Sequence, residues 1–150
     1  MKINGAKAVA FMLRQLGINR VWGIPGAKIL SLYNEMHHLG VNTVLVTNES
    51  SASFMADGYY RVSGKPGVCV SIPGPGLTNM ITGIAEAFLD SSAMLIITVN
   101  PKKGSRSFYI HDVPQLKILK PIAKKIFPIS SIDQIKDLYK AYYCCCSDEP

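Results

Sequence analysis

A single carboxylate, Glu49, lies where an apolar segment gives way to a helical pattern. Residues 44–47 are rich in β-branched side chains, and apolar residues recur at intervals of three and four after Glu49, which is typical of a strand followed by a helix. Glu49 is therefore expected at the carboxyl end of a strand, where ligands bind in open α/β sheets. Two interpretations stay open: Glu49 stabilises the first turn of its helix, or it is a catalytic acid.

Two glycine-proline turns follow other apolar segments. They are Gly23–Gly26 and Pro73–Gly76, and their glycines suit tight turns and also permit close approach of a ligand to the backbone. Asn79, in the helix after the second turn, is either a satisfied polar residue of the first helical turn or a ligand contact. The second turn is no phosphate loop, because it lacks the pattern Gly-x-x-x-x-Gly-Lys.

The order of segments predicts an α/β fold. Helices alternate with strands that are continuous apolar runs, which is typical of a mostly parallel sheet covered on both faces. We therefore expect a three-layer αβα architecture with a doubly wound sheet, in which the three turns lie side by side at one edge. The predicted elements are helices at Gly5–Leu16, from Ile29 to about Leu39, at Glu49–Val62 and at Leu77–Leu89, and strands at 20–23, 41–47, 68–72 and 94–99.

The pattern is less regular after Asn100. We expect a polar loop, then a short helix within Val113–Leu119, an edge strand at Ala123–Ile129 and a last helix from Ser131 or Asp133. The apolar spacing predicts which side chains three of the helices bury. These are Ile29, Leu32, Tyr33 and Met36 in the helix from Ile29, Ala52, Met55, Ala56, Tyr59 and Val62 in the Glu49 helix, and Ile132, Ile135, Leu138, Tyr139 and Tyr142 in the last helix.

Composition restricts the class of protein. The 150 residues suit one domain, and the net charge of +6 is scattered, which favours a solvated surface or an anionic ligand over a nucleic-acid interface. There is no signal-peptide core, and the longest apolar run, residues 93–99, is too short for a bilayer. We therefore expect a cytoplasmic protein that does not bind membranes. The four cysteines match no zinc motif and indicate a reducing compartment.

The residues around Glu49 resemble the glutamate motif of thiamine diphosphate-dependent enzymes, in the acetolactate synthase branch. Gly23–Gly26 resembles the Gly-x-Pro-Gly turn of this family, and residues 73–79 and 83–91 resemble two further segments. The resemblance covers nearly the whole chain and identifies residues 1–150 as the N-terminal, pyrimidine-binding domain. The glutamate motif reads Glu49-x-x-Ala52-x-x-x-Ala56-Asp57-Gly58-Tyr59-x-Arg61.

The resemblance implies a cofactor site. Glu49 would be the catalytic acid, bonded to N1′ of the aminopyrimidine so that the 4′ nitrogen takes the proton from carbon 2. The diphosphate and its magnesium would be held by a domain absent from this chain, so no metal ligand is expected here. The resemblance also implies a homodimer or homotetramer, a 2-oxo acid substrate and a role in branched-chain amino acid biosynthesis. The implied cofactor contacts are Ile24, Pro25, Gly26, Glu49, Pro75 and Asn79, and the implied substrate-side residues are Phe108 and Lys124.

Departures from the family pattern keep alternatives open. Ile72-Pro73 replaces Thr-Ser, and Tyr109-Ile110 replaces a polar pair; the adjacent His111 is either an exposed loop residue or a proton carrier. The leading hypothesis is part of an acetolactate synthase-like carboligase acting on pyruvate. The alternatives are the same domain of a 2-oxo acid or oxalyl-type decarboxylase, and a non-catalytic assembly module. We expect the chain to be a piece of a longer polypeptide that is inactive in isolation.

Overall fold

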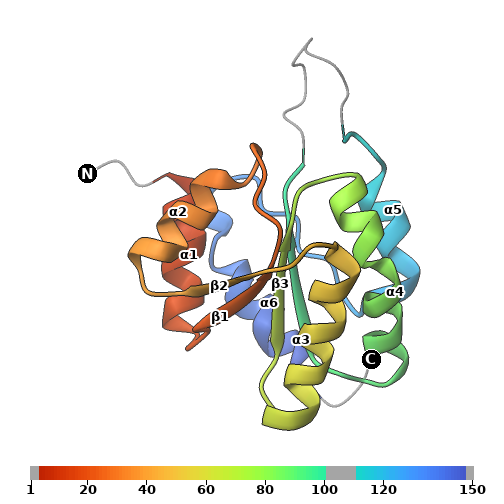
Figure 1. The fold of residues 1–150 in the computed structure, drawn as a ribbon. Coiled ribbons are helices and arrows are strands. Elements are labelled where there is room, and N and C mark those ends of the chain that lie inside the picture. The colour runs from red at the N-terminus through yellow and green to blue at the C-terminus, as the bar shows by residue number, and fades with distance from the viewer. Residues whose placement is uncertain (1–3, 101–110, 148–150) are drawn as a thin grey trace.

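The fold is built on four parallel strands in the order β2-β1-β3-β4. A computed structural model describes residues 4–100 and 111–147, and Figure 1 shows the strands between two groups of helices. This confirms the predicted α/β class and the parallel sheet. The elements are α1 (Gly5–Gln15), β1 (Arg20–Gly23), α2 (Leu30–His38), β2 (Asn42–Leu45), α3 (Glu49–Ser63), β3 (Gly67–Ser71), α4 (Pro75–Leu89), β4 (Met94–Thr98), α5 (Gln115–Leu119), the short 3-10 helices η1 (Lys120–Ile122) and η2 (Ile132–Gln134), and α6 (Asp137–Cys145).

The winding of the sheet reverses between β1 and β3. From β1 the chain passes through α2 to β2 on one side, and from β2 it passes through α3 to β3 on the other. All pairs are parallel, and Gly23 at the end of β1 faces Val70 of β3 in the register. The carboxyl ends of the strands therefore meet at one edge, uppermost in Figure 1, and the ends of β1 and β3 form a topological switch point.

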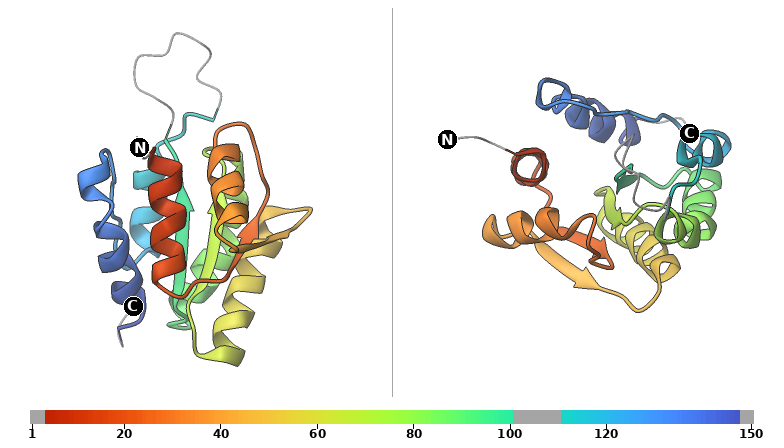
Figure 2. Two further views of the ribbon diagram at one scale, coloured as in Figure 1. Left: turned by 90° about the vertical axis from the view of Figure 1, so that its left-hand side faces the viewer. Right: turned by 90° about the horizontal axis from the view of Figure 1, so that it is seen from above.

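Helices cover both faces of the sheet. One core joins α1, α2 and α6 to one face, and a second joins α3, α4 and α5 to the other, as the view from above shows (Figure 2). This explains why the strands are apolar on both sides. The predicted inner face of α2 is confirmed. Its buried side chains are Ile29, Leu32, Tyr33 and Met36.

The buried face of α3 differs from the prediction. Ala52 and Ala56 are buried as expected, but Met55 is 47 % and Val62 is 91 % exposed, and Ser53 and Asp57 are buried instead. Small side chains on this face let α3 lie very close to α4, since a Cβ on Gly83 would stand 2.3 Å from the Ser53 hydroxyl oxygen. Close packing between backbones has therefore prevailed over burial of the largest apolar side chains.

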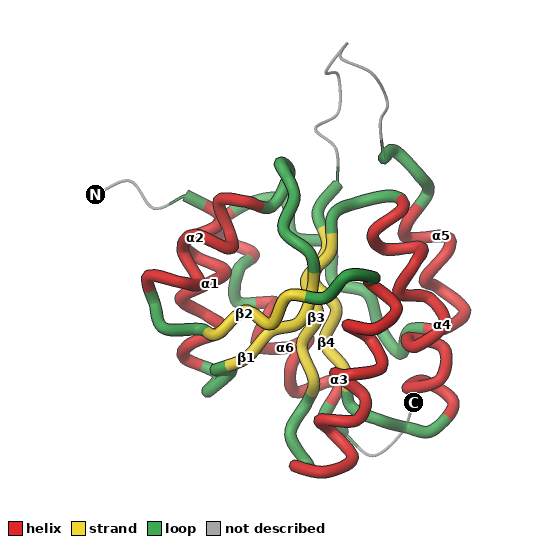
Figure 3. The backbone as a smooth tube through the Cα atoms, viewed as in Figure 1, coloured by secondary structure: helices red, strands yellow, loops and turns green. Residues whose placement is uncertain are grey.

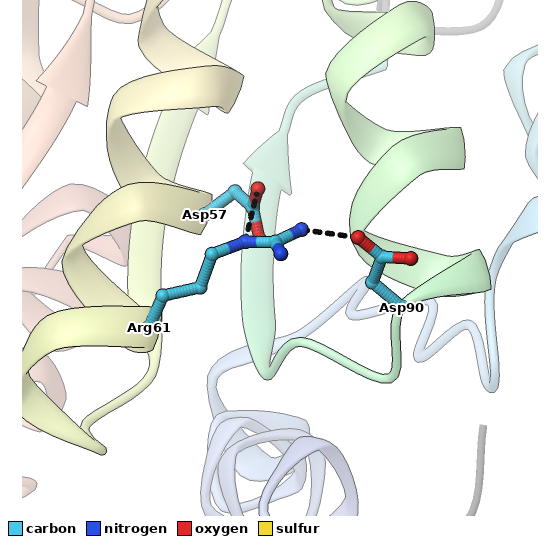
Figure 4. Close-up of polar contacts among 3 residues, drawn as sticks. All are labelled: Asp57, Arg61 and Asp90. Atoms are coloured by element: carbon cyan, nitrogen blue, oxygen red, sulfur yellow. Dashed lines mark hydrogen bonds and ion pairs between the residues drawn. The ribbon is translucent and has the colours of Figure 1, made fainter.

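An ion-pair network joins the ends of α3 and α4. The Arg61 Nε donates to Asp57 Oδ2 at 2.9 Å, and its Nη2 donates to Asp90 Oδ2 (Figure 4). The Asp57 side chain is only 8 % exposed, and both carboxylates raise the pKa of the Arg61 guanidinium through their hydrogen bonds. Arg61 therefore neutralises a carboxylate that has little access to water.

Replacing Arg61 with alanine should lower the free energy of unfolding, because it leaves the buried Asp57 carboxylate unpaired. Urea denaturation measures the change. Lys140→Ala is the control, since Lys140 pairs with Asp137 at the surface of α6 and such pairs contribute little. Equal effects of the two substitutions would show that the network has no structural importance.

The predicted edge strand at Ala123–Ile129 is wrong. These residues form no strand (Figure 3). Together with β4 they line a groove of about 1040 Å³. The predicted last helix is also shorter than expected. It begins as η2 and continues as α6, and among the residues predicted to face inward only Leu138 is buried.

The cysteines carry free thiols. Cys69 is buried in the second core, and burial raises the pKa of its thiol. Burial also raises the pKa of Cys145 to about 12. Among residues 4–100 and 111–147, no helix combines the length and apolarity needed to cross a bilayer.

Candidate functional site

Three turns meet at the carboxyl edge of the sheet, as the sequence predicts. A Cβ on Gly26 would lie 2.6 Å from Ile72 Cγ2, and a Cβ on Gly76 would lie 2.5 Å from Ile72 Cγ1. Ile72 therefore packs between the turn after β1 and the start of α4, and glycine is needed on both sides of it. The third turn joins them through Glu49, because the same Cβ on Gly76 would lie 3.4 Å from Glu49 Oε1.

The Glu49 carboxylate is directed at α4 and does not cap its own helix. Its Oε2 accepts a hydrogen bond of 3.1 Å from Asn79 Nδ2. The side chain that caps α3 is that of Asn48, whose Oδ1 accepts from the Ser50 N–H at 2.9 Å. Asn48 thus provides the side-chain cap of α3, and Glu49 lies in the first turn of that helix with its carboxylate turned to Asn79. The Oε1 atom makes no hydrogen bond to the described residues.

The other residues predicted to contact a cofactor lie in the turns at the same edge of the sheet as Glu49. Ile24 and Gly26 are half-buried in the first turn, and Pro25 is exposed beside them. Pro75 begins α4 and is exposed, and Asn79 lies one turn further along the helix. The structure thus brings the predicted residues to one edge, with proline rings outside and the acid between the turns.

The predicted substrate-side residues do not join this group in the described structure. Phe108 lies outside the described residues. The Lys124 ammonium donates to the backbone oxygen and the hydroxyl of Ser147, both at 2.8 Å. Lys124 lines the groove beside β4, and no residue predicted to contact the cofactor lines that groove. Its substrate-side role stays a prediction.

His111 is partly buried and packs against the second turn. A Cβ on Gly74 would stand 2.6 Å from His111 Cα, so His111 packs directly on the second turn. Gly74 itself has φ +71°, a backbone conformation that favours glycine. The sequence identifies the glycine turn but contains no signal that residue 111 packs on it.

Tyr33 also lies near the site. The sequence predicts that this residue is buried in the core, but it does not predict that its hydroxyl lies close to the turns. Its hydroxyl oxygen lies 2.6 Å from the position of a Cβ on Gly23, at the end of β1. No hydrogen-bond partner meets this buried hydroxyl in the described structure. The apolar spacing of α2 predicts burial of the ring and says nothing about the hydroxyl.

The arrangement places an acid beside two closely packed turns. The missing side chains of Gly26 and Gly76 make room for the Ile72 side chain, so the two turns lie close together. Glu49, at the edge of these turns, can exchange or share a proton with a ligand nitrogen. The described residues include no group of three or more His, Cys, Asp or Glu side chains that could hold a metal ion.

Comparison with known proteins identifies the family of the chain. Residues 3–121 match the model of the family described as thiamine pyrophosphate enzyme, N-terminal TPP binding domain. The chain is 37 % identical to the acetolactate synthase isozyme 2 large subunit of Escherichia coli and 38 % identical to the acetolactate synthase large subunit of Haemophilus influenzae, over 99 % of its length in each case. It is also 46 % identical, over 64 % of its length, to a probable 2-ketoarginine decarboxylase of Pseudomonas aeruginosa.

These relatives are much longer than the chain. The alignments cover 27 % of the Escherichia coli protein, 26 % of the Haemophilus influenzae protein and 17 % of the Pseudomonas aeruginosa protein. The chain thus spans about a quarter of the length of the two synthase subunits.

Proposed function

Since the chain belongs to the thiamine pyrophosphate enzyme family, in its N-terminal TPP binding domain, we propose that the three turns bind the aminopyrimidine of thiamine diphosphate. The observation that carries this proposal is the direction of the Glu49 carboxylate. It meets Asn79 and lies beside Gly76, while Asn48 caps the helix. An acid that does not cap its helix and that lies beside the glycine turn at Gly76 is suited to form a hydrogen bond with a ring nitrogen.

Each residue of the site has a defined task in this proposal. Thiamine diphosphate, when bound, supplies an electron sink. Glu49 would share a proton with a ring nitrogen through Oε1, and Asn79 fixes the carboxylate by donating to Oε2. Ile24, Pro25, Gly26 and Pro75 would form the walls, and Ile72 packs between the two glycine turns.

We further propose that the domain acts within an acetolactate synthase-like carboligase, a transferase that uses pyruvate. The identities to two acetolactate synthase large subunits support this. The proposal includes a second domain that holds the diphosphate and magnesium, a homodimer or homotetramer, a cytoplasmic location and a role in branched-chain amino acid synthesis. Half of the site would then come from outside residues 1–150.

A 2-oxo acid decarboxylase is the second candidate. The Pseudomonas aeruginosa relative favours it, as does Ile72-Pro73 in place of the hydroxyl side chains of the synthase pattern. Product analysis of the protein at its natural length separates the candidates. Pyruvate would be converted to acetolactate by a carboligase and to acetaldehyde by a decarboxylase, and an oxalyl-type enzyme or an assembly module would form neither.

Residues 1–150 alone should bind thiamine diphosphate weakly or not at all, because they lack the domain proposed for the diphosphate. Isothermal titration calorimetry with magnesium present measures the affinity, and the natural-length protein is the positive control. Micromolar binding by the isolated chain would contradict the proposed division of the site.

A further inference from the structure

Tyr33 carries a buried hydroxyl that has no partner in the described structure. The residue is only 8 % exposed, and its hydroxyl oxygen makes no hydrogen bond. Buried polar atoms in folded proteins almost always have a partner, so an orphaned one calls for an explanation. A ligand that arrives from outside the chain would provide the missing partner.

The Tyr33 hydroxyl lies at the topological switch point of the sheet, between β1 and β3. A Cβ on Gly23 would lie 2.6 Å from the Tyr33 oxygen and 2.1 Å from the carbonyl oxygen of Val70. Gly23 and Val70 face each other in the β1–β3 register, and the strand order reverses between these strands. The hydroxyl thus lies at the strand ends of the switch point, which is where α/β sheets bind ligands.

Tyr33 and Glu49 belong to helices that cover opposite faces of the sheet. Tyr33 belongs to the core with α1 and α2, whereas Ala52, on the same helix as Glu49, belongs to the core with α4. Burial raises the pKa of the Tyr33 phenol, and the negative charge of Glu49 raises it further. The phenol therefore keeps its proton at neutral pH and is available as a donor.

We propose that the Tyr33 hydroxyl is a second polar contact of the site and donates a hydrogen bond to a nitrogen heterocycle bound at the ends of β1 and β3. The inference rests on the proposed function, which supplies a ring with acceptor nitrogens. Glu49 and Tyr33 would then hold the ring from the two faces of the sheet. Tyr33 would select for a ligand with an acceptor on the side opposite to Glu49.

Tyr33→Phe in the natural-length protein tests this inference, because it removes the hydroxyl and keeps the ring. The thermal unfolding temperature of the cofactor-free variant should be unchanged or higher, since no internal hydrogen bond is lost. The dissociation constant for thiamine diphosphate should rise about three- to tenfold, as expected for one hydrogen bond. Tyr143→Phe is the control, because Tyr143 is 64 % exposed on α6, and it should change neither quantity.

Each other outcome overturns the inference. A lower unfolding temperature of the cofactor-free Tyr33→Phe protein would show that the hydroxyl has an internal partner. An unchanged dissociation constant at an unchanged unfolding temperature would show that the ligand does not use it, and would leave the proposed function intact. Absence of thiamine diphosphate binding by the unsubstituted protein would overturn the inference and the proposed function together.

Discussion

Replacing Glu49 with glutamine should lower the turnover number of the natural-length protein by roughly 10²–10⁴-fold, the range typical of a lost acid–base group. A carboxamide has the same shape but cannot share a proton with a ring nitrogen. Its oxygen can still accept the hydrogen bond that Asn79 donates, so the fold should be retained. Steady-state kinetics measures the loss, and circular dichroism checks the fold.

The matched control for this substitution is Glu86→Gln. Glu86 is exposed on α4, so its charge is removed at a distance from the three turns. The control should keep normal turnover. Near-normal turnover of the Glu49→Gln protein would remove Glu49 from the mechanism.

Replacing Gly23 with alanine should lower the free energy of unfolding by about 3 kcal/mol, at the upper end of the usual cost of overpacking. The added Cβ would lie 2.1 Å from the carbonyl oxygen of Val70. Backbone atoms cannot move aside as a flexible side chain can, so β1 and β3 would have to separate. Urea denaturation of the two proteins measures the difference.

Gly58→Ala is the control for the glycine substitution. Gly58 lies inside α3, and a Cβ there would meet no atom within 4 Å. Alanine should therefore raise the free energy of unfolding by about 0.5–1 kcal/mol, since it restricts the unfolded chain and favours the helix. Equal stabilities of the Gly23→Ala and Gly58→Ala proteins would show that β1 and β3 are not as closely packed as described.

The overall fold could be predicted because its signals are local. Continuous apolar runs separated by helical patterns indicate a covered parallel sheet, and parallel connections bring the turns to one edge. The meeting of Gly26, Ile72 and Gly76 follows from that topology. The contact between Glu49 and Asn79, 30 residues apart, follows from the same gathering of turns.

Other features depend on packing between distant segments and could not be predicted. The apolar spacing of α3 favours burial of Met55 and Val62, but the close approach of α4 at Gly83 buries Ser53 instead. The apolar residues at 123–129 suggest a strand. A strand requires a hydrogen-bonded neighbouring strand, and this segment instead lines a groove together with β4. Lys124 donates a hydrogen bond to Ser147, which the C-terminal segment brings close to it.

The hydrogen-bond partners of individual polar atoms could not be predicted from the sequence either. Asn48 and Glu49 are adjacent, and either can cap a helix. The backbone at the start of α3 decides that Asn48 caps, which leaves Glu49 for another partner. In the same way, the apolar pattern that buries Tyr33 does not reveal that its hydroxyl reaches the end of β1.

A crystal structure of the natural-length protein with thiamine diphosphate bound tests the central claim most directly. We expect the aminopyrimidine between the turns at Gly26 and Gly76, with a ring nitrogen within about 2.6–3.2 Å of a Glu49 carboxylate oxygen. An aminopyrimidine bound elsewhere, for example in the groove beside β4, or a Glu49 carboxylate that faces only water in the complex, would contradict it.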